Sequence, residues 1–257
     1  SGGGAGVQMD IRVMQRLGVF ATTAITAVTA QNLEGVDDVE AVGARSVAAQ
    51  IETVLSGFPV AAVKTGMLWS AASVRVVADA LARTGLPLVV DPVMVATTGA
   101  RLVDDAAIEA YGDLWPLATL VTPNLDEAAV LLGTRPAADR LRDAAEALAA
   151  KLRCAVLLKG GHLEGAPRDV LATEGQTVHW DHPRIAGAHS HGSGCMLSSA
   201  IAARLAHGDP LADACERAIA FTHDALAKGA STGHAGLAAV ELARSDLSHL
   251  RPARAVP

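Results

Sequence analysis

The sequence is poor in aromatic residues and in long apolar runs. Aromatic side chains make up only 3% of the 257 residues, although 51% are hydrophobic. The core must therefore be built from Ala, Val, Leu and Ile, as in helices packed on buried parallel strands. No apolar stretch reaches the roughly 18 residues that a membrane-spanning helix needs. We therefore expect no membrane partner, in spite of a mean hydropathy of +0.31.

Cysteines and basic clusters are also scarce. The three cysteines, Cys154, Cys195 and Cys215, lie far apart without metal-ligand spacing. That usage is typical of reduced thiols in a cytoplasmic protein. The formal net charge is -6 and the isoelectric point is about 5.8. Because no basic block or stripe is present, we expect no nucleic-acid partner.

Short apolar runs alternate with longer amphipathic stretches, which is the pattern of βαβ units around a parallel sheet. The length suits one α/β domain over residues 1–257. The pattern predicts strands at residues 19–29, 60–64, 87–91, 118–122 and 154–159, and two short antiparallel strands within 169–181. It predicts helices at 9–17, 44–57, 70–84, 104–114, 137–151, 194–207 and 210–228, and a short one ending near Gly133. A glycine run usually follows a strand, so we also expect a strand upstream of Ser1.

Polar residues stand at the ends of four predicted apolar strands: Lys64, Asp91, Asn124 and Lys159. In an open parallel sheet the carboxyl ends of the strands meet at one edge, where ligands bind. Any strand needs something polar where it reaches the surface, and for a single position that explanation stays open. Four such residues with glycines close behind favour a binding site.

The segment His189–Cys195 (HSHGSGC) is the strongest candidate for chemistry. Gly192, Ser193 and Gly194 allow a tight turn before a predicted helix, so backbone N–H groups and the helix N-terminus can hold a phosphoryl group. We predict that Cys195, in the first helical turn, has a lowered thiol pKa and accepts the proton of a substrate hydroxyl. A glycine-rich loop with an ordinary buried cysteine is the alternative.

Two further segments offer charged groups. Asn124 and Glu127 either cap the helix that follows or place a carboxylate over nucleotide phosphates, where it holds Mg²⁺ directly or through water. Lys159 precedes two glycines and can reach a phosphate as a mobile point charge, with the carboxylate of Asp91 as a neighbour. The opening glycine run with Asp10 is a poor dinucleotide signature, because no acidic residue ends a clear second strand.

Together these segments resemble one family, the bacterial hydroxymethylpyrimidine/phosphomethylpyrimidine kinases of thiamine biosynthesis. The resemblance extends from Ser1 to about His234 and is carried, in order, by SGGGAGVQMD, ITAVTAQNLEGV, VKTGML, VVDPVMV, LVTPNLDEA, VLLKGGHLEG and HGSGCMLSSAIAARLAHG. It implies a ribokinase-like three-layer α/β/α sandwich with a mostly parallel central sheet. It also implies transfer of the ATP γ-phosphoryl group, with Mg²⁺, to 4-amino-5-hydroxymethyl-2-methylpyrimidine and then to its monophosphate. A homodimer is expected on the same basis.

The resemblance also implies residue roles, in three groups. Gln31, Asp10 and Met67 would hold the pyrimidine, and the Gln31 amide suits a ring nitrogen beside an amino group. The catalytic base would be Cys195, with the anion hole formed by Gly192, Ser193 and Gly194. The nucleotide would be bound by Lys159, Asn124, Glu127 and Asp91, with Mg²⁺ at Glu127.

The chain departs from the family's pattern at a few points, and other functions stay open. Ser190 and Ser193 replace threonines, residues 97–100 lack a Lys and an Asp, and a closing G-H-G-P pattern is only partly present at 233–236. A pyridoxal or pyridoxine kinase is the nearest alternative, since those substrates are also six-membered N-heterocycles with a hydroxymethyl group. A sugar kinase is disfavoured because Cys195 replaces the usual Asp. A non-catalytic binding protein on the same fold is disfavoured by a base beside an anion hole.

Overall fold

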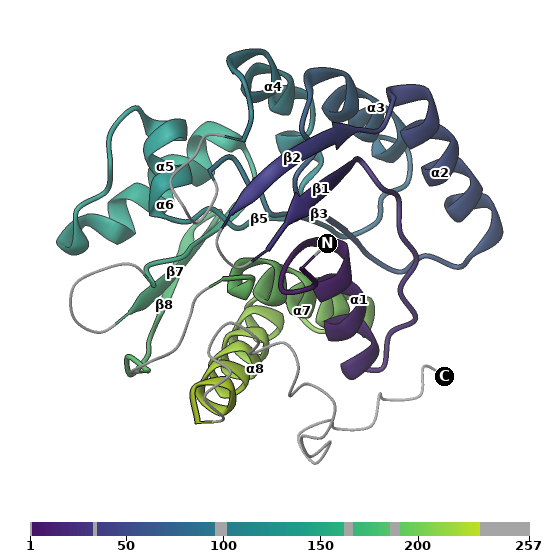
Figure 1. Cartoon of the computed structure of the whole chain (residues 1–257). Coiled ribbons are helices and arrows are strands. Elements are labelled where there is room, and N and C mark those ends of the chain that lie inside the picture. Colours follow the sequence, from purple (N-terminus) through teal and green to yellow (C-terminus); the bar gives the residue numbers. More distant parts are fainter. Residues whose placement is uncertain (1, 33–34, 96–101, 162–166, 186–190, 232–257) are drawn as a thin grey trace, which may run out of the picture.

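The computed structural model describes residues 2–32, 35–95, 102–161, 167–185 and 191–231 (Figure 1). At its centre is a six-stranded sheet with the order β3-β4-β5-β6-β7-β8. The first four strands run parallel and the last two join antiparallel, as predicted. Their bounds are β3 (Val63–Thr65), β4 (Leu88–Val90), β5 (Leu120–Val121), β6 (Ala155–Leu158), β7 (Arg168–Thr173) and β8 (Gln176–Asp181).

Helices cover both faces of this sheet, which confirms the three-layer α/β/α sandwich (Figure 1). One face carries α2 (Ala44–Gly57), α3 (Ala71–Leu81), α4 (Asp105–Ala110), α5 (Leu125–Leu132) and α6 (Leu141–Leu152). The other face carries α1 (Gly6–Arg16), α7 (Ser193–Ala206) and α8 (Leu211–Ser231). No helix in the described ranges is long and apolar enough to cross a membrane.

Successive strand residues alternate between two hydrophobic cores, one under each helical layer. In β4, Val89 packs in the core of α1, α7 and α8, whereas Leu88 and Val90 pack in the opposite core. The same alternation separates Leu157 from Leu158 in β6. Because both faces of these strands are buried, they appear in the sequence as unbroken apolar runs. That is why the sequence predicted their places well.

The predicted helix at 104–114 is shorter than expected. α4 ends at Ala110, and 3₁₀ turns follow at Tyr111–Asp113 and Trp115–Leu117. The rings of Tyr111 and Trp115 stack with centroids 4.5 Å apart, and both residues are buried. The stacked rings hold this segment in place, and Pro116 has no N–H to donate to a helical hydrogen bond. The regular helix therefore ends before this segment.

The predicted strand at 19–29 is wrong over most of its length. Only β1 (Ala27–Gln31) forms, and it pairs antiparallel with β2 (Val36–Ala41) in a separate two-stranded sheet. Before β1, side chains replace a strand partner: the Ile25 N–H donates to Gln50 Oε1 at 2.8 Å, and Gln50 Nε2 donates to the Ile25 carbonyl at 3.1 Å. β-branched residues favour extended backbone, but they cannot provide a neighbouring strand.

The sequence missed β2, because its exposed acidic positions hide the pattern of a strand. The departures from the family's pattern at Ser190, residues 97–100 and residues 233–236 lie outside the described residues. The strand expected upstream of Ser1 stays a prediction. Among the described strands β3 forms one edge of the central sheet, and β8 forms the other.

We expect Gln50→Ala to lower the free energy of unfolding by about 1–3 kcal/mol, because it leaves both polar backbone groups of Ile25 without this partner. Alanine is the better helix former, so helix propensity acts against the effect. Urea unfolding measures the change. Gln176→Ala, at an exposed position of β8, is the control and should cost far less. Equal stability of the two variants would contradict the role of Gln50.

Candidate active site

The carboxyl ends of the four parallel strands bring the predicted polar residues to one edge of the sheet. Lys64 lies in β3 and Asp91 directly follows β4. Asn124 and Lys159 form a parallel bridge just beyond β5 and β6, where the Lys159 N–H donates to the Pro123 carbonyl at 2.8 Å. All four residues line the same cavity. The prediction that the strand ends gather their polar residues at one place is confirmed.

Lys159 and Asp91 form a buried ion pair at the centre of this edge. Lys159 Nζ lies 3.1 Å from Asp91 Oδ1, and Asp91 is only 2% exposed. The second carboxylate oxygen, Oδ2, lies 3.1 Å from the Ser198 hydroxyl of α7. Burial opposes the charge of Lys159, but the carboxylates of Asp91 and Glu127 raise its pKa above the ordinary value. Lys159 therefore remains an ammonium group, as a phosphate contact requires.

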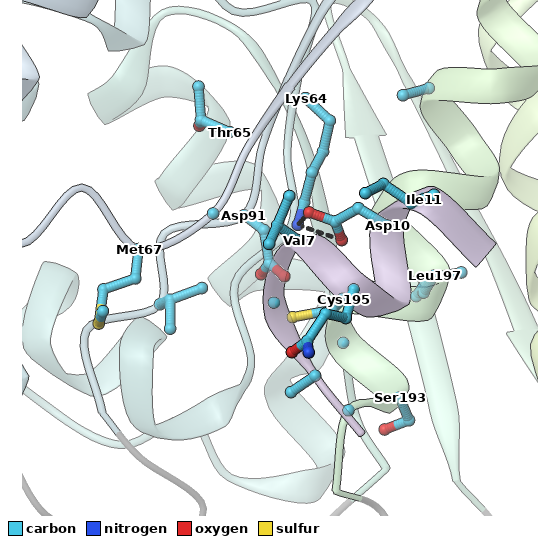
Figure 2. A pocket seen from close by; sticks show the side chains of 18 of the residues that line it. Val7, Asp10, Ile11, Lys64, Thr65, Met67, Asp91, Ser193, Cys195 and Leu197 are labelled. Atoms are coloured by element: carbon cyan, nitrogen blue, oxygen red, sulfur yellow. Dashed lines mark hydrogen bonds and ion pairs between the residues drawn. The ribbon is translucent and has the colours of Figure 1, made fainter. Parts of the chain in front are cut away.

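Lys64 and Asp10 form a second buried ion pair, drawn with dashed lines in Figure 2. Lys64 Nζ lies 2.8 and 3.0 Å from the two carboxylate oxygens of Asp10, and its side chain is 2% exposed. Asp10 Oδ1 also accepts a hydrogen bond from the Ser199 hydroxyl of α7 at 2.7 Å. Burial opposes the charge of Lys64, but Asp10, with Cys195 and Asp91, raises its pKa. The sequence did not reveal this pair, because no local pattern links residues 54 positions apart.

The turn before α7 packs directly on the glycine run that opens the chain. Gly192 has a φ of 78°, and a Cβ there would lie 1.8 Å from the Gly4 carbonyl oxygen. Only glycine fits at this position. At Gly194 a Cβ would lie 3.2 Å from Lys159 Nζ and 3.7 Å from Asp91 Oδ2. The N-terminus of α7 therefore faces the Lys159–Asp91 pair.

Cys195 lies in the first turn of α7, as predicted, but the predicted fall of its thiol pKa is wrong. Burial raises the pKa of Cys195, and Lys64 is the strongest influence in the opposite direction. The carboxylates of Asp91 and Asp10 add to the rise, and hydrogen bonding from the Gly6 N–H opposes it. Desolvation of the thiolate thus outweighs the helix N-terminus. Cys195 is half-buried at the wall of the cavity, and sequence position alone could not show which groups surround it.

Asn124 and Glu127 cap the N-terminus of α5, so this alternative from the sequence is confirmed. Asn124 Oδ1 accepts hydrogen bonds from the Asp126 and Glu127 N–H groups, both at 2.9 Å. In return, Glu127 Oε2 accepts from the Asn124 N–H at 2.8 Å. Glu127 is 2% exposed, and burial raises its pKa while Lys159 opposes the rise. Both residues also line the cavity, so the cap orients a carboxylate towards it.

Gln31 and Met67 border another part of the same cavity. Gln31 ends β1 beside the glycine run, since a Cβ at Gly2 would lie 3.0 Å from its carbonyl oxygen. Met67 follows β3, and its carbonyl accepts a hydrogen bond from the Thr26 hydroxyl at 2.7 Å. Figure 2 shows the Met67 side chain on the far side of Asp91 from Asp10. Met67 and Cys195 therefore border the same cavity from different elements.

Every site residue that the sequence predicted lines this one cavity, whose volume is about 1570 Å³. The volume exceeds the roughly 300–1,000 Å³ of a small-molecule pocket, because the cavity continues beside β3 among apolar side chains such as Ile51, Leu55 and Leu81. Only the polar end is a candidate for chemistry. Among the described residues no group of three or more His, Cys, Asp or Glu is placed to hold a metal.

Comparisons with known proteins identify the family of the chain. The phosphomethylpyrimidine kinase family model matches residues 1–239. The chain is 47% identical over 230 residues to the hydroxymethylpyrimidine/phosphomethylpyrimidine kinase of Rhizobium meliloti (strain 1021), covering 88% of this chain and 86% of the relative.

Two solved structures share the fold. The phosphomethylpyrimidine kinase of Clostridium difficile 630 has a TM-score of 0.76 and 33% identity, over 87% of this chain and 94% of that one. The pyridoxal kinase of Staphylococcus aureus, in complex with AMP-PCP and pyridoxal, has a TM-score of 0.78 and 30% identity, over 88% of this chain and 83% of that one. With a family match over most of its length and a relative at 47% identity, the chain belongs to the phosphomethylpyrimidine kinase family.

Proposed function

We propose that this protein is an ATP-dependent kinase of thiamine biosynthesis that phosphorylates 4-amino-5-hydroxymethyl-2-methylpyrimidine and then its monophosphate. The proposal is carried by the N-terminus of α7, where Cys195 and the Gly192–Gly194 turn meet two buried ammonium groups in one cavity. The phosphoryl group in transfer spreads negative charge over its equatorial oxygens, and catalysis rests on positioning and electrostatic stabilisation. Backbone N–H groups, a helix N-terminus and Lys159 supply that stabilisation.

Cys195 is the proposed base for the hydroxymethyl oxygen. Since burial raises its thiol pKa, the thiol form dominates at low pH and the thiolate fraction grows as the pH rises. A thiolate with a raised pKa is also a stronger base once it has formed. Turnover should therefore increase with pH up to the alkaline range.

The nucleotide phosphates would lie at the end of the cavity that holds Lys159, Asn124, Glu127 and Asp91. Mg²⁺ keeps several waters and usually binds one or two carboxylates together with substrate phosphates. The two carboxylate oxygens of Glu127 already accept backbone N–H groups of Asn124 and Met94, at 2.8 and 3.4 Å. Contact with the ion through one of its waters is compatible with these hydrogen bonds. Glu127 would hold the ion through water, and the ion would neutralise phosphate charge.

The pyrimidine would lie between Gln31 and Met67, with its hydroxymethyl group towards Cys195. A second candidate function is phosphorylation of pyridoxal, which is favoured by the similarity to a pyridoxal kinase bound to pyridoxal. We further propose a single-domain cytoplasmic homodimer. The free thiols of Cys154, Cys195 and Cys215 support the compartment, and the family resemblance supports the dimer.

Release of ADP from Mg-ATP with three acceptors tests the function. The hydroxymethylpyrimidine and its monophosphate should both be turned over, and pyridoxal should react slowly. Turnover with pyridoxal alone would move the assignment to a vitamin B6 kinase. Absence of turnover with all three acceptors would contradict kinase function.

Cys195→Ala should lower kcat by about 10²–10⁴-fold, because the general base is lost, and should leave pyrimidine binding largely intact. Steady-state kinetics and calorimetric titration separate the two effects. Cys215→Ala is the matched control, since that thiol is buried in α8. An unchanged kcat in Cys195→Ala would exclude Cys195 as the base.

Gly192→Ala should abolish most activity, because the added Cβ collides with the Gly4 carbonyl and displaces the anion hole. Gly208→Ala isolates the cost of backbone strain, since Gly208 has a φ of 84° with nothing within 4 Å of an added Cβ. We expect both variants to lose stability in urea unfolding, and only Gly192→Ala to lose kcat. Equal activity in the two variants would contradict the role of the Gly192–Gly4 contact.

A further inference from the structure

We propose that Lys64 is a positioning residue for phosphoryl transfer, whose buried ammonium group stabilises the thiolate form of Cys195. The inference rests on the proposed function, in which Cys195 is the base. Its own test requires no substrate, so it can be checked apart from the reaction.

Lys64 and Cys195 approach the same space from different elements. Figure 2 shows the Lys64 side chain descending from β3 and the Cys195 sulfur pointing from α7, with the Asp91 carboxylate between their levels. Lys64 Nζ packs against Gly66, which follows β3, since a Cβ at Gly66 would be 3.2 Å from it. Its salt bridge with Asp10 fixes it there at 2.8 Å. The ammonium group is thus held at the site by a partner that is itself bound to α7 through Ser199.

Among the groups around Cys195, Lys64 favours the thiolate most strongly. Lys64 and the Gly6 N–H favour the thiolate, whereas Asp91 and Asp10 oppose it. Lys159 also interacts with Cys195, although its nearest carboxylate is Asp91. His191 precedes α7, and burial lowers its pKa, so it adds little positive charge at neutral pH. Without Lys64, only the Gly6 N–H and Lys159 would remain to offset burial and the two carboxylates.

A purely structural role of the Lys64–Asp10 salt bridge and an electrostatic role of Lys64 predict different effects of substitution on Cys195. If the pair only held α1 to β3, removing either partner would perturb Cys195 in the same sense. If Lys64 acts through its charge, loss of Lys64 and loss of the Asp10 charge must affect the thiolate in opposite senses. An opposite charge within a few ångströms shifts a pKa by about 1–3, which is large enough to measure.

The test is the rate at which iodoacetamide alkylates Cys195, followed against pH by mass spectrometry of its peptide. The thiolate displaces iodide, so the rate reports the thiolate fraction. At pH 8 we expect Lys64→Met to slow alkylation by about 10-fold or more and Asp10→Asn to accelerate it. Lys64→Arg, which keeps the charge, should restore most of the rate. Should Lys64→Met not fold, the double variant Lys64→Met/Asp10→Asn removes both charges and should still alkylate more slowly than Asp10→Asn alone.

Shifts of the same sign in Lys64→Met and Asp10→Asn would overturn the proposal, as would an unchanged profile in folded Lys64→Met. The pH profile of kcat in the same variants tests the proposed function separately. If alkylation shifts as expected while the kcat profile does not, Lys64 controls the thiolate but Cys195 is not the base. In that case the electrostatic role of Lys64 stands and the proposed mechanism fails.

Discussion

Two buried ammonium groups, each paired with one carboxylate, hold the site together. Lys159 joins the end of β6 to Asp91 after β4, and Lys64 joins β3 to Asp10 on α1. Neighbouring serines of α7 contact one pair each, Ser198 at Asp91 and Ser199 at Asp10. Consecutive helical residues point about 100° apart, so one helix reaches both pairs. Removing one member of such a pair costs about 3–5 kcal/mol, because the other charge is left buried without its partner.

The same burial explains the chemistry of the site. It strengthens the attraction between each lysine and its carboxylate, since interactions between charges grow as the dielectric falls. It also raises the pKa of the Cys195 thiol and of the Glu127 carboxyl. A buried site of this kind suits phosphoryl transfer, because the low dielectric strengthens the interaction of each charged group with the negative charge of the phosphate.

The sequence predicted the central sheet and which residues line the polar end of the cavity, because both follow from local patterns. Apolar runs ending in Lys64, Asp91, Asn124 and Lys159 marked parallel strands and their carboxyl ends. Prediction from the sequence failed where a residue's interaction partner is distant along the chain. The stretch before β1 forms no strand, and both polar backbone groups of Ile25 bond to the Gln50 side chain. The Lys64–Asp10 pair and the burial that raises the thiol pKa of Cys195 depend on elements that only the folded chain brings together.

The contact between Gly192 and Gly4 has a consequence for how the protein acquires activity. The Asp10–Ser199 hydrogen bond beside it joins residues 189 positions apart, and contacts of such long range are slow to close. During synthesis Gly4 cannot make this contact until α7 has left the ribosome, after the strands of the central sheet have been made. Catalytic competence should therefore appear as one of the last events of folding, after the sheet and its helical layers have formed.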